Sequence, residues 1–395
     1  MKLTYNFQKD LIGFLVGFLM LSLLYFRIGW FFRYNYAVAL SFYVFVFFGF
    51  LLTTFFSFRL IRLPGFWGIS LLILFEVSIH FSVVLSIKNQ KRSLLPIPEK
   101  AVFYASMANI VQYDSALSEF NDRYGYLYKS STNSVFNQWE FGDTNIHSNS
   151  AGLRDDDESS QHPEIICLGD SFTTGWGVDQ QETFAQILER ETSMKVLNAG
   201  ISSFGTVRET LLLEKFVSDS CKWVVIQYCM NDFQENTAWL TGYKTYEPRF
   251  HKEGYKLRVT QNQVFSSYSP FRYTYEYLKQ LLILAFKLKT DERVFGNDQN
   301  MEEQVSTFYT HLQSIRKFYN GNIIVISQSN SSTRLDPLFI NTCRELSEKD
   351  NAEKVYFVDT NSMLRSDDNY YFDEHLKPSG HRKVADVLTD FIRSY

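Results

Sequence analysis

The chain has 395 residues, of which 45% are hydrophobic, and its formal net charge at pH 7 is −4. A nearly neutral balance without a basic stripe excludes nucleic acid as an expected partner. The hydrophobic residues are crowded into the N-terminal quarter of the chain, which predicts a membrane anchor followed by a soluble domain.

Three strongly apolar runs predict three transmembrane helices, at about residues 11–26, 36–58 and 63–87. The second and third runs are long enough to cross a bilayer, which needs about 20 residues, and the first reaches that length with its flanks. No small-residue cleavage site follows the first run, so we expect a retained anchor and not a signal peptide. Residues 1–94 are therefore predicted to form a multi-pass anchor whose partner is the lipid bilayer.

The third apolar run carries two ionisable residues, Glu76 and His80. Because they are four residues apart, they share one face of a helix and can pair. An ionisable group inside a membrane is by default a functional hypothesis, and mutual satisfaction of the two groups is the alternative. The basic residues on the two sides of the spans are balanced, so charge alone does not predict the orientation of the anchor.

The soluble domain is predicted over residues 95–395 and is expected to be an α/β fold. Short apolar runs alternate there with amphipathic helical patterns, which predicts a flavodoxin-like parallel sheet with helices on both faces. The predicted strands are residues 164–169, 195–198, 222–229, 322–327 and 354–358, and the predicted helices between them are residues 183–192, 207–217, 301–319 and 337–349.

The third and fourth predicted strands are separated by a segment too long for a connection in such a fold. We therefore predict an insertion with structure of its own at about residues 233–300. Loops at strand ends often control access and specificity, so one expectation is that the insertion covers the site. The alternative is that its aromatic residues rest on the bilayer.

The four cysteines all lie beyond the predicted spans. Cys221 and Cys229 flank one predicted strand, which separates them too far for a disulfide. No cysteine or histidine pair outside the membrane has the spacing of metal ligands, so no metal site and no cofactor are predicted.

Four polar motifs follow predicted strand ends or precede the last helix. They are Gly169-Asp170-Ser171, Asn198-Ala199-Gly200, Asn231-Asp232 and Asp373-Glu374-His375. Because the carboxyl ends of parallel strands meet at one edge of a sheet, we expect these motifs to converge. On its own Ser171 is better explained as the cap of the following helix, so its interpretation as a nucleophile depends on the four motifs together.

Serine, glycine, asparagine and histidine in this order resemble the four sequence blocks of the SGNH (GDSL-type) hydrolases, over about residues 149–395. The string GDSFTTGWGV also resembles the membrane-tethered bacterial branch of that family. The resemblance implies that Ser171 is the nucleophile and His375 its base. It further implies an oxyanion hole formed by the backbone amides of Ser171 and Gly200 with the side-chain amide of Asn231.

The acid that orients the histidine departs from the common family pattern. Relatives often place it three residues before the histidine, where this chain has Phe372. Asp373, two residues before His375, is the acid that we expect to complete the triad, at a spacing that resembles the membrane-tethered and acetyl-transfer branches. A dyad held by a backbone carbonyl is an alternative. The other acids that remain possible are Glu374, Asp367 and Asp368.

Residues close to the motifs carry further expectations. Asp170 is expected to hydrogen-bond its own loop, and His381 to be structural. Arg154, in a segment that resembles one found in the tethered branch, contacts an anionic substrate or forms a structural salt bridge. Cys229 stands where many relatives have glycine.

The expected function is that of a membrane-anchored serine esterase that removes acyl groups, in the first instance acetyl, from cell-envelope carbohydrate or glycolipid. An O-acyltransferase with the same machinery is the first alternative. A non-catalytic assembly protein that keeps the fold is the second. Tethered relatives work outside the cytoplasm, so the resemblance implies an extracytoplasmic catalytic domain.

Overall fold

The computed structural model describes residues 5–31, 36–89, 109–138, 140–240, 251–266, 270–285, 301–329, 335–350 and 353–395. The chain divides into two compact units. The first comprises residues 1–110 with 256–290, and the second comprises residues 111–255 with 291–395. Part of the predicted insertion therefore groups with the N-terminal residues.

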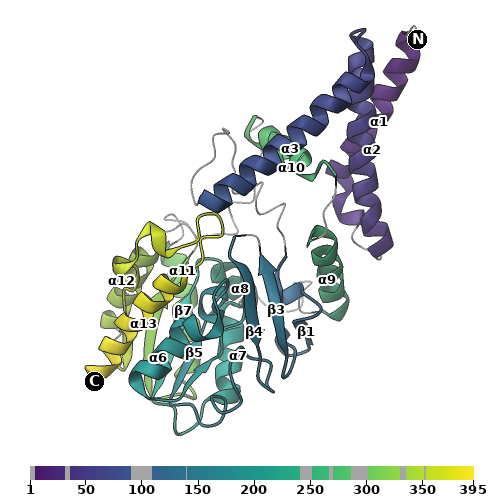
Figure 1. Ribbon diagram of the computed structural model, residues 1–395. Helices are drawn as coiled ribbons and strands as arrows, with labels where there is room; N and C mark the ends of the chain where they lie inside the picture. Colours follow the sequence, from purple (N-terminus) through teal and green to yellow (C-terminus); the bar gives the residue numbers. More distant parts are fainter. Residues whose placement is uncertain are drawn as a thin grey trace. The chain divides into compact units, whose positions relative to one another are not determined.

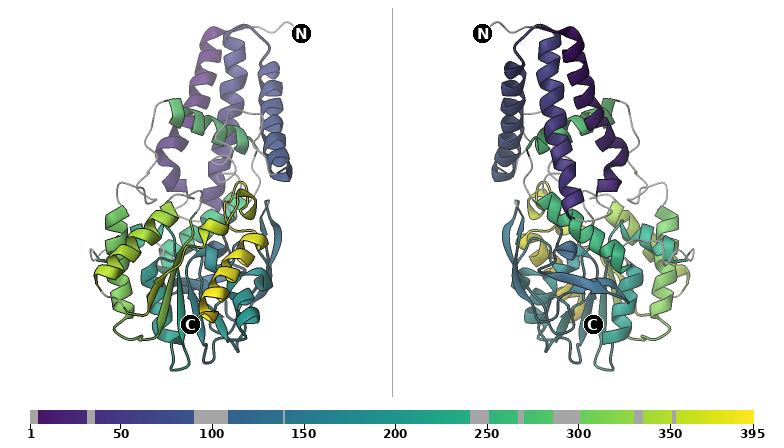
Figure 2. Two further views of the ribbon diagram at one scale, coloured as in Figure 1. Left: turned by 90° about the vertical axis from the view of Figure 1, so that its left-hand side faces the viewer. Right: turned by 90° about the vertical axis from the view of Figure 1, so that its right-hand side faces the viewer.

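The first unit contains three long helices, α1 (Phe7–Phe31), α2 (Tyr36–Leu60) and α3 (Gly65–Asn89), which run side by side (Figure 2). Among the described residues, two segments are long and apolar enough to cross a membrane, Tyr43–Leu60 and Gly65–Lys88. The side chains of the last part of α1, from residue 23, lie outside the described ones. The structure thus supports two candidate spans, and the third span stays a prediction.

Helix α10 (Arg272–Ala285) lies against α3 in the same unit (Figure 1). Phe271, which precedes it, is buried in an apolar cluster with residues of α2 and α3. The predicted pairing of Glu76 with His80 is wrong, because the Glu76 carboxylate accepts its hydrogen bonds from Tyr273 and Thr274 of α10. The His80 ring packs on that of Tyr273 instead, with centroids 4.9 Å apart.

The second unit is built on a five-stranded sheet whose strands are all parallel. The strands are β5 (Ile165–Leu168), β6 (Val196–Asn198), β7 (Trp223–Tyr228), β8 (Asn322–Ser327) and β9 (Val355–Phe357). Their spatial order is β6-β5-β7-β8-β9, which is the flavodoxin-like order. The predicted sheet is confirmed, because strands buried on both faces leave an apolar signal in the sequence.

Helices cover both faces of this sheet. On one face α6 and α13 pack together over alternate side chains of β5, β7 and β8 (Figure 1). On the other face the Tyr228 ring stacks on Phe339 of α12 and meets Phe308 of α11 edge-on. The helices of this unit are α6 (Phe184–Thr192), α7 (Thr206–Phe216), α8 (Asp232–Leu240), α11 (Met301–Ile315), α12 (Leu335–Lys349) and α13 (Pro378–Arg393). Helix α9 (Lys252–Ser266) begins in this unit, and from residue 256 it belongs to the first.

Two antiparallel hairpins precede the sheet and were not anticipated. They pair β1 (Ser118–Asn121) with β2 (Gly125–Tyr128), and β3 (Asn133–Gln138) with β4 (Gly142–His147). Strands β3 and β4 are short and mostly polar, so they give no clear periodic signal. The second hairpin contributes directly to the site described next.

Candidate active site

Ser171 lies at the topological switch point of the sheet. The chain leaves β5 for β6 on one side and returns to β7 on the other, and ligands bind in such folds at the carboxyl end of the strand between. The short helix α5 (Ser171–Thr174) starts there. Its cap is Asp170, whose Oδ1 accepts the Phe172 N–H at 3.0 Å. Because Asp170 holds the helix, the hydroxyl of Ser171 is not needed as a cap.

Ser171 is hydrogen-bonded to a histidine that lies 204 residues later in the chain. Its Oγ is 2.6 Å from Nε2 of His375. The other ring nitrogen of His375, Nδ1, hydrogen-bonds Oδ1 of Asp373, which is almost fully buried. This contact fixes the tautomer in which Nε2 is free to accept the serine proton. The arrangement is that of a serine–histidine–aspartate triad.

A tight turn brings Asp373 and His375 to the same place. Tyr370 N–H donates to the His375 carbonyl, and the side-chain amide of Asn369 donates to the Glu374 carbonyl at 2.8 Å. Glu374 adopts φ = 67°, a conformation that non-glycine residues rarely take outside functional or tightly packed segments. Among the other candidate acids, Asp368 instead accepts from Lys383 at 2.6 Å.

Burial and the neighbouring carboxylate act in opposite directions on the pKa of His375. Burial by itself lowers the pKa of the imidazole, but the adjacent Asp373 carboxylate outweighs it, so that the pKa of His375 is raised from its ordinary value. The rings of Phe172 and Trp176 enclose the imidazole, with centroids 4.6 Å and 5.9 Å away. Dry aromatic surroundings strengthen the interaction between His375 and Asp373.

Two residues that sequence reasoning missed hold the triad acid. The indole Nε1–H of Trp176 donates to Oδ2 of Asp373 at 3.1 Å. Glu140, at the tip of the β3–β4 hairpin, accepts the backbone N–H groups of Phe372 at 3.0 Å and Asp373 at 2.8 Å. The sequence around Glu140 shows only a single acid among aromatic residues, which is a weak indication of a functional role. Nothing in that local sequence links Glu140 to a turn about 232 residues away.

The predicted oxyanion residues form a less complete hydrogen-bond arrangement than the triad residues do. A Cβ on Gly200 would lie 2.4 Å from the Thr174 nitrogen, so only glycine fits beside α5. The Gly200 N–H, however, donates to Oδ1 of Asn198 at 3.1 Å within the chain. Oδ1 of Asn231 is buried and has no hydrogen-bond partner among the described residues. The oxyanion role of these residues stays a prediction.

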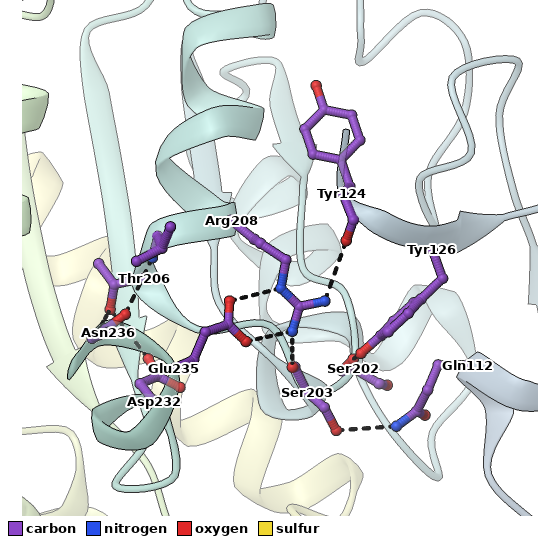
Figure 3. Close-up of polar contacts among 11 residues, drawn as sticks. Gln112, Tyr124, Tyr126, Ser202, Ser203, Thr206, Arg208, Asp232, Glu235 and Asn236 are labelled. Atoms are coloured by element: carbon purple, nitrogen blue, oxygen red, sulfur yellow. Dashed lines mark hydrogen bonds and ion pairs between the residues drawn. The ribbon is translucent and has the colours of Figure 1, made fainter. Parts of the chain in front are cut away.

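A buried ion pair locks the loop after β6 to the start of α8 (Figure 3). Arg208 of α7 makes two parallel hydrogen bonds to Glu235 of α8, of 2.7 Å and 2.6 Å. The guanidinium also donates to the carbonyl oxygens of Tyr124 and Ser203 and stacks over the Phe204 ring. Because Gly200 and Asn231 flank these segments, the pair fixes the backbone that carries both.

The same end of α7 and α8 holds further buried acids. Thr206 donates its hydroxyl to Asp232 at 3.2 Å (Figure 3). Burial raises the pKa of Glu209 and Asp232 well above the usual range, and each raises that of its neighbours further.

Both interpretations of Arg154 are wrong. Its guanidinium is fully buried, and its partners are backbone carbonyl oxygens, not carboxylates or solvent. It donates to the carbonyl oxygens of Thr174, Gly175, Asn145 and Val178 at 2.6–3.0 Å. Arg154 therefore shapes the loop that follows the candidate nucleophile.

His381 and Asp170 behave as expected. Nδ1 of His381 accepts the Phe184 N–H at 3.2 Å, and burial lowers the pKa of this histidine to about 3. It is thus a neutral acceptor inside the fold.

A cavity of about 510 Å³ lined by Tyr309 and Lys354 lies where β8 and β9 begin, at the edge of the sheet opposite to Ser171, and has no part in this site.

No family model and no curated protein matches the chain. It is similar to the solved structure of a member of the lipolytic protein G-D-S-L family from Veillonella parvula, at 14% identity and a TM-score of 0.35, over 58% of this chain and 98% of that one. A family two carbohydrate esterase from Clostridium thermocellum matches at 15% identity and a TM-score of 0.34, over 58% and 63% of the two chains.

An acetyl xylan esterase from the rumen bacterium Butyrivibrio proteoclasticus is similar over the same shares, at 14% identity and a TM-score of 0.31. At this identity and overlap the likeness carries no argument about the reaction, for which the triad geometry is the guide.

Proposed function

We propose that the chain is an SGNH-type serine esterase that cleaves acyl esters through an acyl-enzyme. The observation that supports the proposal is the continuous hydrogen-bonded series from Ser171 Oγ through the His375 ring to the Asp373 carboxylate. A serine hydroxyl becomes a nucleophile only when a base takes its proton, and a neutral imidazole does so near pH 7.

The reaction proceeds in two halves. Ser171 Oγ attacks the ester carbonyl while Nε2 of His375 takes the hydroxyl proton, and Asp373 stabilises the imidazolium that forms. Collapse of the tetrahedral intermediate releases the alcohol, which receives that proton from His375. Water then attacks the acyl-Ser171 ester with the same base, which frees the acid and restores the serine.

The negative charge on the tetrahedral oxygen needs preorganised donors. We assign this role to the backbone amides of Ser171 and Gly200 and to the side-chain amide of Asn231. When the oxyanion forms, the Gly200 N–H gives up its hydrogen bond to Asn198 and donates to the oxyanion instead. Hydrogen bonds in an unliganded site are often formed with other partners and tighten only in the complex. Each such donor stabilises the transition state by about 3 kcal/mol.

We further propose that three transmembrane helices anchor the enzyme, with the catalytic domain on the extracytoplasmic side. The two described candidate spans support membrane attachment. The substrate that we propose is cell-envelope carbohydrate or glycolipid, and acetyl is the acyl group. The support for these choices is the resemblance of GDSFTTGWGV to tethered relatives.

The experiment that tests the proposal is ester hydrolysis by the full-length chain in detergent or nanodiscs. Wild-type protein is expected to hydrolyse p-nitrophenyl acetate and to be labelled at Ser171 by a fluorophosphonate probe. Ser171→Ala should lower kcat by about 10⁶-fold, the scale seen when a triad serine is removed. A folded wild-type chain that the probe does not label would favour the non-catalytic assembly protein.

The second candidate is an O-acyltransferase, in which a sugar hydroxyl and not water resolves the acyl-enzyme. Asp373 two residues before His375 favours it, since this spacing resembles the acetyl-transfer branch. Mass spectrometry of envelope glycans from cells with wild-type protein and with Ser171→Ala separates the two. Acyl groups that depend on Ser171 for their presence indicate transfer, and acyl groups that accumulate in its absence indicate hydrolysis.

A further inference from the structure

Helix α10 begins where its first backbone amides meet a carboxylate from another helix. Tyr273 N–H donates to Oε1 of Glu76 at 3.2 Å, and Thr274 donates both its N–H and its hydroxyl to Oε2 at 2.7 Å. The residue before the helix is Phe271, whose side chain cannot accept a hydrogen bond. The cap of α10 is thus supplied by α3, and the acidic group favours the positive end of the helix dipole.

The contact lies near the middle of a candidate membrane span. Glu76 is eleven residues from the start of α3, or about 17 Å along a helix that is about 37 Å long. The hydrocarbon core of a bilayer is about 30 Å thick. If Gly65–Lys88 crosses the membrane, the first turn of α10 therefore lies deep within it.

The course of the chain shows that α10 cannot cross to the other side. Residues 111–255, which precede this segment, and residues 291–395, which follow it, both belong to the second unit. With 14 residues, α10 is about 21 Å long, which is shorter than the hydrocarbon core. The segment must therefore enter and leave on the side where the second unit lies.

The start of α10 is buried in protein, and its following described turns carry exposed apolar side chains. Thr274 and Glu276 are buried, whereas Leu278 and Leu281 are 39% and 37% exposed. The Tyr277 ring meets Phe75 of α3 with centroids 5.5 Å apart. The charged Lys279 is paired with Glu276 at 3.0 Å, so the helix does not present an unpaired cation there.

We infer that α10 is a re-entrant helix that dips into the bilayer beside α3, held at that depth by Glu76, with its exposed leucines against lipid acyl chains. Backbone N–H groups at that depth have no water to bond, and each unsatisfied one costs several kcal/mol. A carboxylate in the neighbouring span removes this cost. The inference rests on the proposed membrane anchoring and assigns Glu76 the task of placing the insertion.

Cysteine accessibility in nanodiscs tests it, since both aqueous faces are then open to reagent. The full-length chain carries Leu278→Cys or Leu281→Cys, and a charged maleimide reports the rate of labelling. The native cysteines are all buried. Met363→Cys, at a residue 56% exposed in the second unit, is the aqueous control, and Leu74→Cys, at a residue 61% exposed on α3, is the lipid control.

Leu278→Cys and Leu281→Cys should be labelled at least about tenfold more slowly than Met363→Cys, because a thiol in hydrocarbon neither ionises nor meets the reagent. Adding Glu76→Ala should speed labelling at residue 278 without changing it at residue 74, and Glu76→Gln, which keeps an acceptor, should have a smaller effect. Labelling at 278 as fast as at 363, with 74 slow, overturns the re-entrant helix alone. Fast labelling at 74 overturns the membrane anchoring and this inference together.

Discussion

The two halves of the candidate site differ in how fully they are assembled. On the side of the base, Ser171, His375 and Asp373 are already joined by hydrogen bonds, and Glu140 and Trp176 hold the acid from a separate hairpin and loop. On the oxyanion side, the Gly200 N–H is bonded to Oδ1 of Asn198, so this donor is held by a partner within the protein.

This difference indicates where the protein is preorganised and where substrate completes the site. A general base must lie within hydrogen-bonding reach of the serine hydroxyl, since a displaced imidazole cannot take its proton. Oxyanion donors act on a charge that exists only in the transition state, so they can hold other partners until then. The Arg208–Glu235 pair keeps the backbone of this half rigid while its amide partners change.

The largest effect after loss of the nucleophile is expected on the base side. Asp373→Asn should lower kcat by about 10⁴-fold, because the imidazole loses the partner that fixes its tautomer. Asp373 also raises the pKa of His375, so activity falls on acidification as the imidazole becomes protonated, and the acidic limb of the profile should move to lower pH in the variant.

The pH dependence of kcat/KM from pH 5 to 9 checks this prediction. Asp367→Asn is the matched control, because this exposed acid lies in the same region and was a candidate for the same role. An unchanged acidic limb in Asp373→Asn, or an equal loss in Asp367→Asn, would show that another acid orients the base.

On the oxyanion side, Asn231→Ala should lower kcat by about 10²- to 10³-fold with little change in KM, since its donor acts only in the transition state. Steady-state kinetics on p-nitrophenyl acetate measures the split. Asn320→Ala, at an exposed asparagine of the second unit, is the control. A loss confined to KM would remove Asn231 from the oxyanion hole and leave the triad unaffected.

Glu140 tests the base side indirectly, because it acts on the triad through the turn that carries Asp373. Glu140→Ala should lower kcat by roughly tenfold by releasing the turn that carries Asp373, and Glu140→Gln, which keeps an acceptor, should recover part of it. Asp143→Ala, in the same hairpin, should leave kcat near wild type, since the Asp143 carboxylate accepts a hydrogen bond from Asn137 of the hairpin and none from the turn that carries Asp373 among the described residues.

A double-mutant cycle separates positioning from a general loss of stability. In the Asp373→Asn background, Glu140→Ala should add little to the loss of kcat, because the group that it positions is already gone. Full additivity of the two losses would mean that Glu140 stabilises the fold without orienting the triad acid.

The smallest effect is expected at Cys229, which lies on the oxyanion side of the site. Burial raises the pKa of this thiol well above its ordinary value, so it is a neutral, unreactive group in the folded enzyme. Cys229→Ala should change kcat by less than about twofold and the free energy of unfolding by about 1 kcal/mol. Kinetics and urea denaturation measure both, and a large loss of kcat would place the thiol in the reaction.

The sequence by itself predicted the parallel sheet, because each of its strands is an apolar run that reads as buried on both faces. It also predicted which motifs meet, since carboxyl ends of parallel strands share one edge. The separation of Ser171 from His375 along the chain was therefore no obstacle. The nearby Asp373 could be proposed from its spacing to the histidine.

Only the tertiary structure decided what surrounds these residues. Glu140 is 232 residues from the turn that it holds, Glu76 is 198 residues from Thr274, and the partners of Arg154 are carbonyl oxygens, which every residue possesses. Periodicity and motif spacing report on a few neighbouring residues, whereas these contacts depend on which segments pack together. A buried polar side chain must find a partner wherever the fold provides one, and the local sequence does not say where.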